Sequence, residues 1–145
     1  MKKISLLLLT CTFLILGGCS VLEEVNSSVN YVNEGTEYIN ELTAFGEEAS
    51  SLLNDAATSP EAKEELEEQL TALRANIEEF NEIEPPSLAE DIHQSIVSKN
   101  EQLIEEIDRV YQNGELAIEQ LNNTEIFTTI NELRDTLNQI EELEL

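Results

Sequence analysis

Residues 58–86, TSPEAKEELEEQLTALRANIEEFNEIEPP, contain a complete amphipathic helix together with its start and its end. Thr58-Ser59 suits the N-cap, where a hydroxyl accepts a hydrogen bond from a free backbone amide, and Pro60 suits the first turn. Apolar residues then recur at alternating intervals of four and three, which is typical of a helix that buries one stripe. They are Leu66, Leu70, Leu73, Ile77 and Phe80. The pair Pro85-Pro86 ends the segment.

The next segment has a wider apolar stripe, which predicts a helix in contact with two neighbours. Ser87, with Glu90 three positions later, forms a capping box for its start. Three lines of residues recur every seven positions: Ile96-Leu103-Val110-Ala117, Val97-Ile104-Tyr111-Ile118 and Asn100-Ile107-Gly114-Leu121. We expect this helix to break at Asn122-Asn123. A break at Asn113-Gly114 is the alternative.

Two further amphipathic segments complete a set of four predicted helices. An apolar line from Leu22 to Ala56 predicts one long helix, with a kink as an alternative because Gly35 and Gly46 weaken helices. A last helix carries Ile126, Ile130, Leu133, Leu137 and Ile140. Short connections make neighbouring helices antiparallel, so residues 28–145 predict an all-α, up-down-up-down four-helix bundle without a sheet.

The composition is strongly acidic and limits the class of partner. The 145 residues include 31 Asp or Glu and only 7 Lys or Arg, and the formal net charge is -24. This length predicts one domain. Nucleic acid is excluded as a partner because phosphate binding needs a basic face. On electrostatic grounds the favoured partner is a basic protein of the cell envelope or a cation-rich wall layer.

The amino-terminal residues have the features of an export signal. Met1-Lys2-Lys3 is basic, and Ile4 to Leu16 is a predominantly apolar run of thirteen residues. A bilayer span takes about 20 residues, so this run is too short to cross a membrane but suits a signal peptide. Leu16-Gly17-Gly18-Cys19 follows, and it resembles the lipobox of bacterial lipoproteins, with an aliphatic residue and two small ones before a cysteine.

This resemblance implies specific processing of the chain. A diacylglyceryl group would be attached to the Cys19 thiol, and a peptidase would cut between Gly18 and Cys19. Residues 1–18 would then be a removed signal peptide, and residues 19–27 a lipidated tether on the extracytoplasmic face of the cell membrane. The whole chain resembles small uncharacterised all-helical lipoproteins of Gram-positive bacteria. Removal of Lys2 and Lys3 would leave five basic residues against 31 acidic ones, a net charge of -26.

Three residues are candidates for ligand or partner contact. His93 is the chain's one imidazole, and we expect it to pack near the Pro85-Pro86 turn with a ring nitrogen bonded to a neighbour. A ligand or proton-switch role for His93 is the alternative. Asn100 lies on an inner line, where a polar residue can fix register. Gly114 either makes room for a neighbour's bulk or opens a groove for a ligand.

Nothing in the sequence predicts catalysis, a cofactor or a metal site. The one histidine has no second histidine beside it, and the positions four residues away are Ala89 and Val97, although Glu90 lies three residues before it. No nucleophile motif is present. The paired carboxylates predict a solvated face; they are Glu64-Glu65, Glu67-Glu68, Glu78-Glu79, Glu105-Glu106 and Glu141-Glu142. We therefore expect a non-enzymatic protein-interaction module. A binding module for cations or a small apolar ligand is the alternative, and the oligomeric state stays open.

Overall fold

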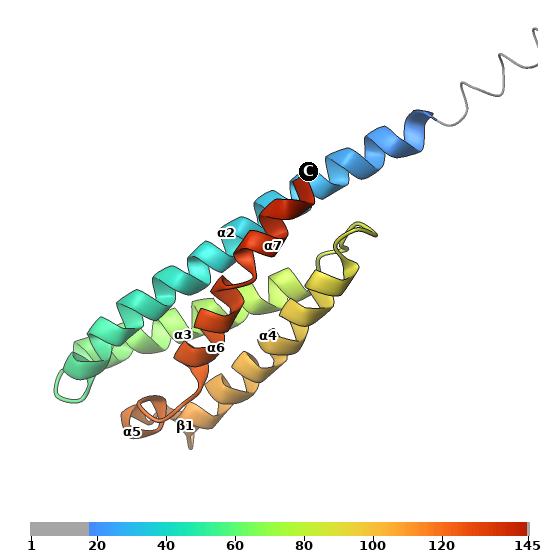
Figure 1. The fold of residues 1–145 in the computed structure, drawn as a ribbon. Helices are drawn as coiled ribbons and strands as arrows, with labels where there is room; N and C mark the ends of the chain where they lie inside the picture. Colours follow the sequence, from blue (N-terminus) through green and yellow to red (C-terminus); the bar gives the residue numbers. More distant parts are fainter. Residues whose placement is uncertain (1–17, 145) are drawn as a thin grey trace, which may run out of the picture.

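The computed structural model describes residues 18–144, most of which are helical (Figure 1). Three long helices come first: α2 (Gly18–Ala56), α3 (Pro60–Asn81) and α4 (Glu90–Val110). The predicted signal peptide, apart from its last glycine, lies outside the described residues. Within those residues we find no helix that is both long and apolar enough to cross a membrane.

Several short elements follow α4 in place of one last helix. They are β1 (Tyr111–Gln112), β2 (Glu115–Leu116), α5 (Ile118–Leu121), α6 (Ile126–Arg134), α7 (Leu137–Glu141) and the 3-10 helix η1 (Glu142–Glu144). The single helix predicted through Ile126 and Ile140 is therefore wrong, because Asp135 and Thr136 separate α6 from α7. The predicted four-helix bundle is not confirmed in that simple form, whereas a mainly helical fold is.

A small hairpin corrects the prediction that the chain contains no sheet. The strands β1 and β2 pair antiparallel, with Tyr111 opposite Leu116. Asn113 and Gly114 connect them with φ angles of 56° and 85°. Two central residues with positive φ are typical of the type I′ turn that joins short strands. The long helix thus ends at Val110, so the alternative break at Asn113-Gly114 is confirmed for it, and the prediction that it continues to Asn122-Asn123 is wrong. Asn122-Asn123 do form a break, but between α5 and α6.

The helices surround one hydrophobic core. α2 lies against α3 on one side and against α6 and α7 on the other, while α4 lies against α3 and α6. Figure 1 shows α7 running beside α2, and the connection between α3 and α4 lying at the end of the fold where α2 begins. α4 therefore packs along the two neighbours that its wide apolar stripe predicts, and it also contacts α5.

α2 is one helix of 39 residues and continues through the predicted tether, residues 19–27, without a break. The functional division at residue 27 stays a prediction. Gly35 lies inside this helix where a Cβ would come within 3.3 Å of the Ile140 side chain. The absence of a side chain at Gly35 thus allows α7 to pack closely on α2, which explains a glycine in a helix interior.

The starts of α3 and α4 differ in how well the sequence predicts them. Ser59 is the N-cap of α3, and its hydroxyl accepts a hydrogen bond of 3.3 Å from the Ala62 amide. All five apolar positions predicted for α3 are buried. α4 begins later than predicted: Ala89 is its N-cap and makes no side-chain bond. The predicted capping box of Ser87 and Glu90 is therefore wrong.

Candidate functional site

Two tyrosines of α2 meet two polar residues of α4 across the core. The Tyr31 hydroxyl lies 3.3 Å from Nδ1 of His93, and the Tyr38 hydroxyl donates to Oδ1 of Asn100 at 2.5 Å. In each pair the tyrosine and its partner are 62 residues apart in the chain. The two tyrosines on α2 are seven residues apart, and so are His93 and Asn100 on α4. A constant separation means that α2 and α4 run parallel, with their seven-residue repeats in register.

Phe80 of α3 lies between these two pairs. Its ring stacks on Tyr38 with the ring centroids 4.2 Å apart and the planes 15° apart. The His93 ring centroid is 5.3 Å from that of Phe80 and 5.8 Å from that of Tyr31. Aromatic contacts of this kind add to the stabilisation that burial alone gives. The four residues and Asn100 form one buried cluster that joins the three long helices.

Asn100 is fully buried, and both ends of its amide have a partner. Oδ1 accepts the hydrogen bond from Tyr38, and Nδ2 donates to Oδ1 of Asn81 at 2.7 Å. A buried amide without partners would be costly, so its hydrogen bonds favour one arrangement of α2, α3 and α4 over shifted ones. This geometry agrees with the register role considered for Asn100.

Burial controls the ionisation of the two groups at the other end of the cluster. It lowers the pKa of His93 below 6.5, because the charged imidazolium loses its hydration between aromatic rings. Burial also raises the pKa of Tyr31 to about 12. Both groups are therefore neutral near pH 7. His93 packs with Nδ1 close to a neighbour, as predicted.

Gly114 does not lie where the sequence places it. The residue is exposed in the hairpin turn, and a Cβ added there would meet nothing within 4 Å. The prediction of a helix-lining Gly114 with a groove or a neighbour's bulk beside it is wrong, because α4 has already ended. Gly18 and Cys19 are the first residues of α2, and lipid attachment at Cys19 stays a prediction.

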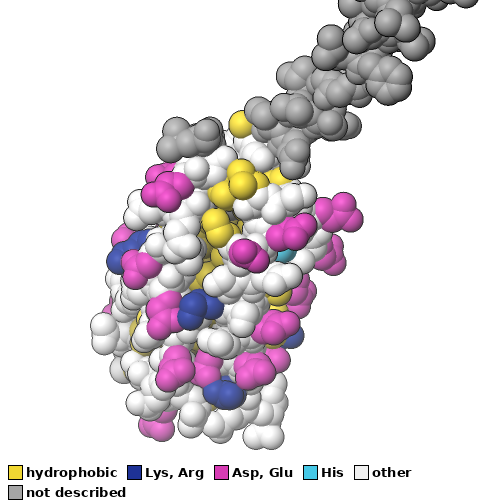
Figure 2. All heavy atoms as spheres, turned by 45° about the vertical axis from the view of Figure 1, so that its right-hand side comes forward, with side chains coloured by type: hydrophobic (Ala, Val, Ile, Leu, Met, Phe, Trp, Pro, Cys, Tyr) yellow, Lys and Arg dark blue, Asp and Glu magenta, His cyan; other side chains and the backbone are white. Residues whose placement is uncertain are grey.

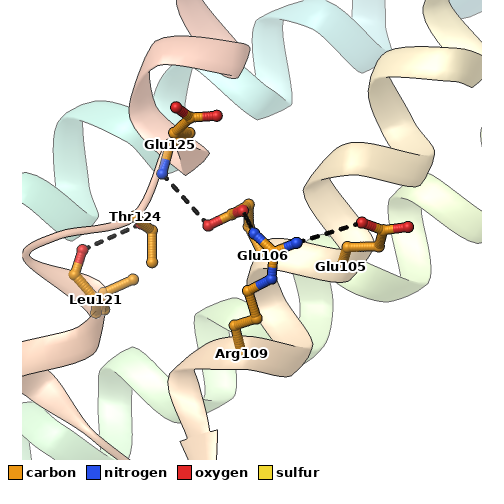
Figure 3. Close-up of polar contacts among 6 residues, drawn as sticks. All are labelled: Glu105, Glu106, Arg109, Leu121, Thr124 and Glu125. Carbon is orange, nitrogen blue, oxygen red and sulfur yellow. Dashed lines mark hydrogen bonds and ion pairs between the residues drawn. The ribbon is translucent and has the colours of Figure 1, made fainter.

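One carboxylate of the predicted solvated pairs is buried instead. Glu106 retains only 9% of its exposed surface, and Arg109 binds one of its oxygens (Figure 3). The other oxygen lies 3.5 Å from the backbone amide of Glu125, the residue just before α6. Glu106 therefore links α4 to the start of α6. The prediction of a solvated face is wrong for Glu106, although its neighbour Glu105 is exposed.

The apolar line predicted from Leu22 to Ala56 does not include the tyrosines of this cluster. Val29, which belongs to that line, is 39% exposed, whereas Val32 of the same line is buried, as are Tyr31 and Tyr38. The signal that identifies them is a line of aromatic residues seven apart, Tyr31-Tyr38-Phe45, which matches the spacing of His93 and Asn100.

The cluster is suited to holding helices in register rather than to chemistry on a substrate. Its polar groups bond to each other, and its rings fill the core. In the part of the chain that the structure describes, no group of three or more His, Cys, Asp or Glu side chains is placed to hold a metal ion. The surface, by contrast, is rich in acidic side chains on the face that Figure 2 shows, with few basic ones.

These features define the class as a small, acidic, mainly helical protein whose described helices do not cross a membrane. Residues 31–143 match the family model described as "Family of unknown function (DUF6376)", and the chain belongs to this family. It is 34% identical over 146 residues to the "Uncharacterized lipoprotein YybP" of Bacillus subtilis (strain 168), with 99% of each chain covered. No solved structure matches the chain.

Proposed function

We propose that this chain is a lipoprotein anchored through Cys19 on the extracytoplasmic face of the cell membrane, where it binds basic envelope proteins without catalysing a reaction. The anchor is supported by the Leu16-Gly17-Gly18-Cys19 motif and by the word lipoprotein in the name of the Bacillus subtilis relative. The absence of a membrane-crossing helix among residues 18–144 is compatible with a lipid anchor.

The observation that carries the binding proposal is the pairing of the chain's own basic residues. Four of the five that remain after Lys2 and Lys3 are removed already hold carboxylates of this chain; they are Lys63, Arg74, Lys99 and Arg109. Most of the 31 acidic residues therefore have no internal cation to neutralise them. Such a surface attracts a basic partner, with an association rate that falls as salt increases.

Affinity capture from membranes tests this proposal. The full chain with a carboxyl-terminal tag is solubilised in neutral detergent, and co-purified proteins are identified at 50 mM and 500 mM NaCl. We expect basic envelope proteins at the lower salt and their loss at the higher. A bait made of residues 1–27 and the tag is the control, since it has the same anchor without the bundle.

The proposal fails if the full chain retains nothing beyond this control at 50 mM NaCl. It also fails if the retained proteins are not basic and resist the higher salt. Of the alternatives, the ligand groove beside Gly114 has no place in the structure, because that glycine lies in an exposed turn.

A further inference from the structure

Two adjoining cavities follow the surface along which α2 packs on α3. They have volumes of about 330 Å³ and 480 Å³, and both are lined by Glu34 and Ile83. They therefore form one open groove, which we call the α2/α3 groove. It extends along α2 from Asn26 to Glu41. At 1.5 Å per helical residue this is about 22 Å.

The floor and the rim of the α2/α3 groove have different chemistry. The floor is closed by Tyr31, Tyr38 and Phe80, which keep only 2–5% of their surface exposed, and by the half-buried Ile83. The rim carries five exposed carboxylates: Glu34, Glu37, Glu41, Glu79 and Glu84. A narrow apolar floor between carboxylates suits a side chain with an apolar stem and a cationic end.

The chain's own cations lie elsewhere. No Lys, Arg or His is among the residues that line the α2/α3 groove. The described ion pairs between helices join Arg74 to Asp108 and Lys99 to Glu132, away from this groove. Among the rim carboxylates, Glu41 accepts a hydrogen bond of 2.9 Å from the amide of Asn76. The groove therefore combines a long concave surface with carboxylates that no cation of the described chain neutralises.

We propose that the α2/α3 groove binds an extended peptide segment rich in Lys or Arg from the partner protein. An extended chain rises about 3.3 Å per residue, so about seven residues span the groove. Lysine stems lie along the apolar floor at Ile83, and their ammonium groups reach the rim carboxylates. This inference rests on the proposed function and adds to it the surface and the kind of segment that binds.

A labelled basic heptapeptide tests the groove directly. The probe is fluorescein-labelled Lys-Ala-Lys-Phe-Lys-Ala-Lys, titrated by fluorescence anisotropy with the full chain in neutral detergent micelles at 50 mM NaCl. We compare a groove variant, E34Q/E37Q/E41Q, with a control variant, E101Q/E115Q/E119Q, whose three exposed carboxylates lie on α4, β2 and α5. Both variants lose three charges, so general attraction weakens equally in the two.

We expect the groove variant to bind the heptapeptide at least tenfold more weakly than the wild type, and the control variant less than twofold more weakly. Equal losses in the two variants would overturn the proposal, because binding would then follow net charge alone. Failure of the wild type to bind the heptapeptide would also overturn it. Circular dichroism verifies that each variant is helical.

A second pair of variants places a cation in the groove. Asn76 lines it, whereas Ala75 is exposed and does not. N76R should weaken heptapeptide binding at least fivefold, and A75R should have less than a twofold effect, although both add the same side chain. Equal effects contradict the assignment of this surface.

Three outcomes separate this inference from the proposed function. If spermine or Ca²⁺ binds as tightly as the heptapeptide and loses affinity in the groove variant, the groove is a small-cation site and the peptide proposal is wrong. If the groove variant captures basic envelope proteins as well as the wild type does, only the location is wrong. If the wild type captures none, the proposed function itself fails.

Discussion

The hydroxyl of Tyr38 has one evident role in the buried cluster, which is to satisfy Oδ1 of Asn100. Substitution Y38F keeps the ring on Phe80 but leaves this buried oxygen without its donor. An unsatisfied buried acceptor costs about 1–3 kcal/mol, so we expect a loss of that size in the free energy of unfolding. Urea unfolding followed by circular dichroism measures it.

The double variant Y38F/N100L is the control for this prediction, since it removes both members of the hydrogen bond. It should be more stable than the sum of the two single changes predicts, because no buried polar group of the pair is left. Additive losses would mean that the bond between Tyr38 and Asn100 contributes nothing to stability.

The depressed pKa of His93 makes stability depend on pH in a defined direction. The folded state binds the imidazole proton less readily than the unfolded state, whose pKa is about 6.5. The unfolded state therefore holds more protons below that pH, and the contribution of His93 to stability, present above pH 6.5, is lost as pH falls.

We therefore expect H93Q to be less stable than the wild type at pH 7.5, and the difference to shrink by pH 5.5. Urea midpoints at pH 7.5, 6.5 and 5.5 measure it. Both chains carry the same carboxylates, so the titration of those groups cancels in the difference. The double variant H93Q/Q94H, with its imidazole at an exposed position, should follow H93Q. If the difference in urea midpoint between H93Q and the wild type does not change with pH, burial does not lower the pKa of His93.

At the scale of elements, the starts of α3 and α4 give opposite expectations for the same substitution. S59A removes the hydroxyl that caps α3, and loss of such a cap costs about 1 kcal/mol. S87A should change the free energy of unfolding by less than about 0.5 kcal/mol, because α4 begins at Glu90 without a side-chain cap. Equal losses in thermal or urea unfolding would restore the capping box that the structure contradicts.

Substitution of a glycine by alanine should have opposite effects on the free energy of unfolding in the hairpin and in α2. Gly114 has a φ of 85°, so G114A strains the turn although nothing lies within 4 Å, and we expect a loss of about 1 kcal/mol. Gly46 lies within α2, and its added Cβ would meet Ile130 at an ordinary 3.5 Å. G46A should therefore gain about 0.5–1 kcal/mol. The same sign in urea unfolding of both variants would contradict this assignment.

The long helices could be predicted because their physical signals agree with one another. In α3 the cap, the proline of the first turn, the spacing of apolar residues and the terminal Pro85-Pro86 pair all indicate one helix. The five apolar residues predicted to be buried there are buried. Where helix propensity, the spacing of apolar residues and the residues that start and end a helix all agree, the sequence is sufficient to predict that helix.

The hairpin could not be chosen from periodicity, because the apolar lines of α4 continue in phase beyond it. Val110 and Ala117 are seven residues apart although a turn lies between them. Asn113-Gly114 is a strong hairpin signal, but it competes with that unbroken pattern. Glu106 lies three residues after Leu103 and four before Val110, so helical spacing already places it on the buried face of α4, whereas its contact with the Glu125 amide comes from a distant segment that no local pattern reveals.

For the whole molecule, the central issue is how α2 relates the folded part to the membrane. α2 begins at Gly18 and enters the bundle without a loop, so an anchor on Cys19 would hold the bundle at short range. The net charge predicted for the mature chain is -26, so anionic lipid would repel the bundle. The lipid anchor would nevertheless keep the bundle near the membrane. Both the proposed localisation and the access to envelope proteins therefore depend on the lipid at Cys19.

Intact mass spectrometry of the protein purified from membranes tests that claim most directly, with C19A as the variant and C11A as its control. We predict a mature chain that begins at Cys19 and carries a diacylglyceryl group on its sulfur. C11A should be processed in the same way, because Cys11 lies in the segment that is removed, and C19A should keep its signal peptide. A wild-type chain with residues 1–18 retained, or with a free Cys19 thiol, would contradict the account.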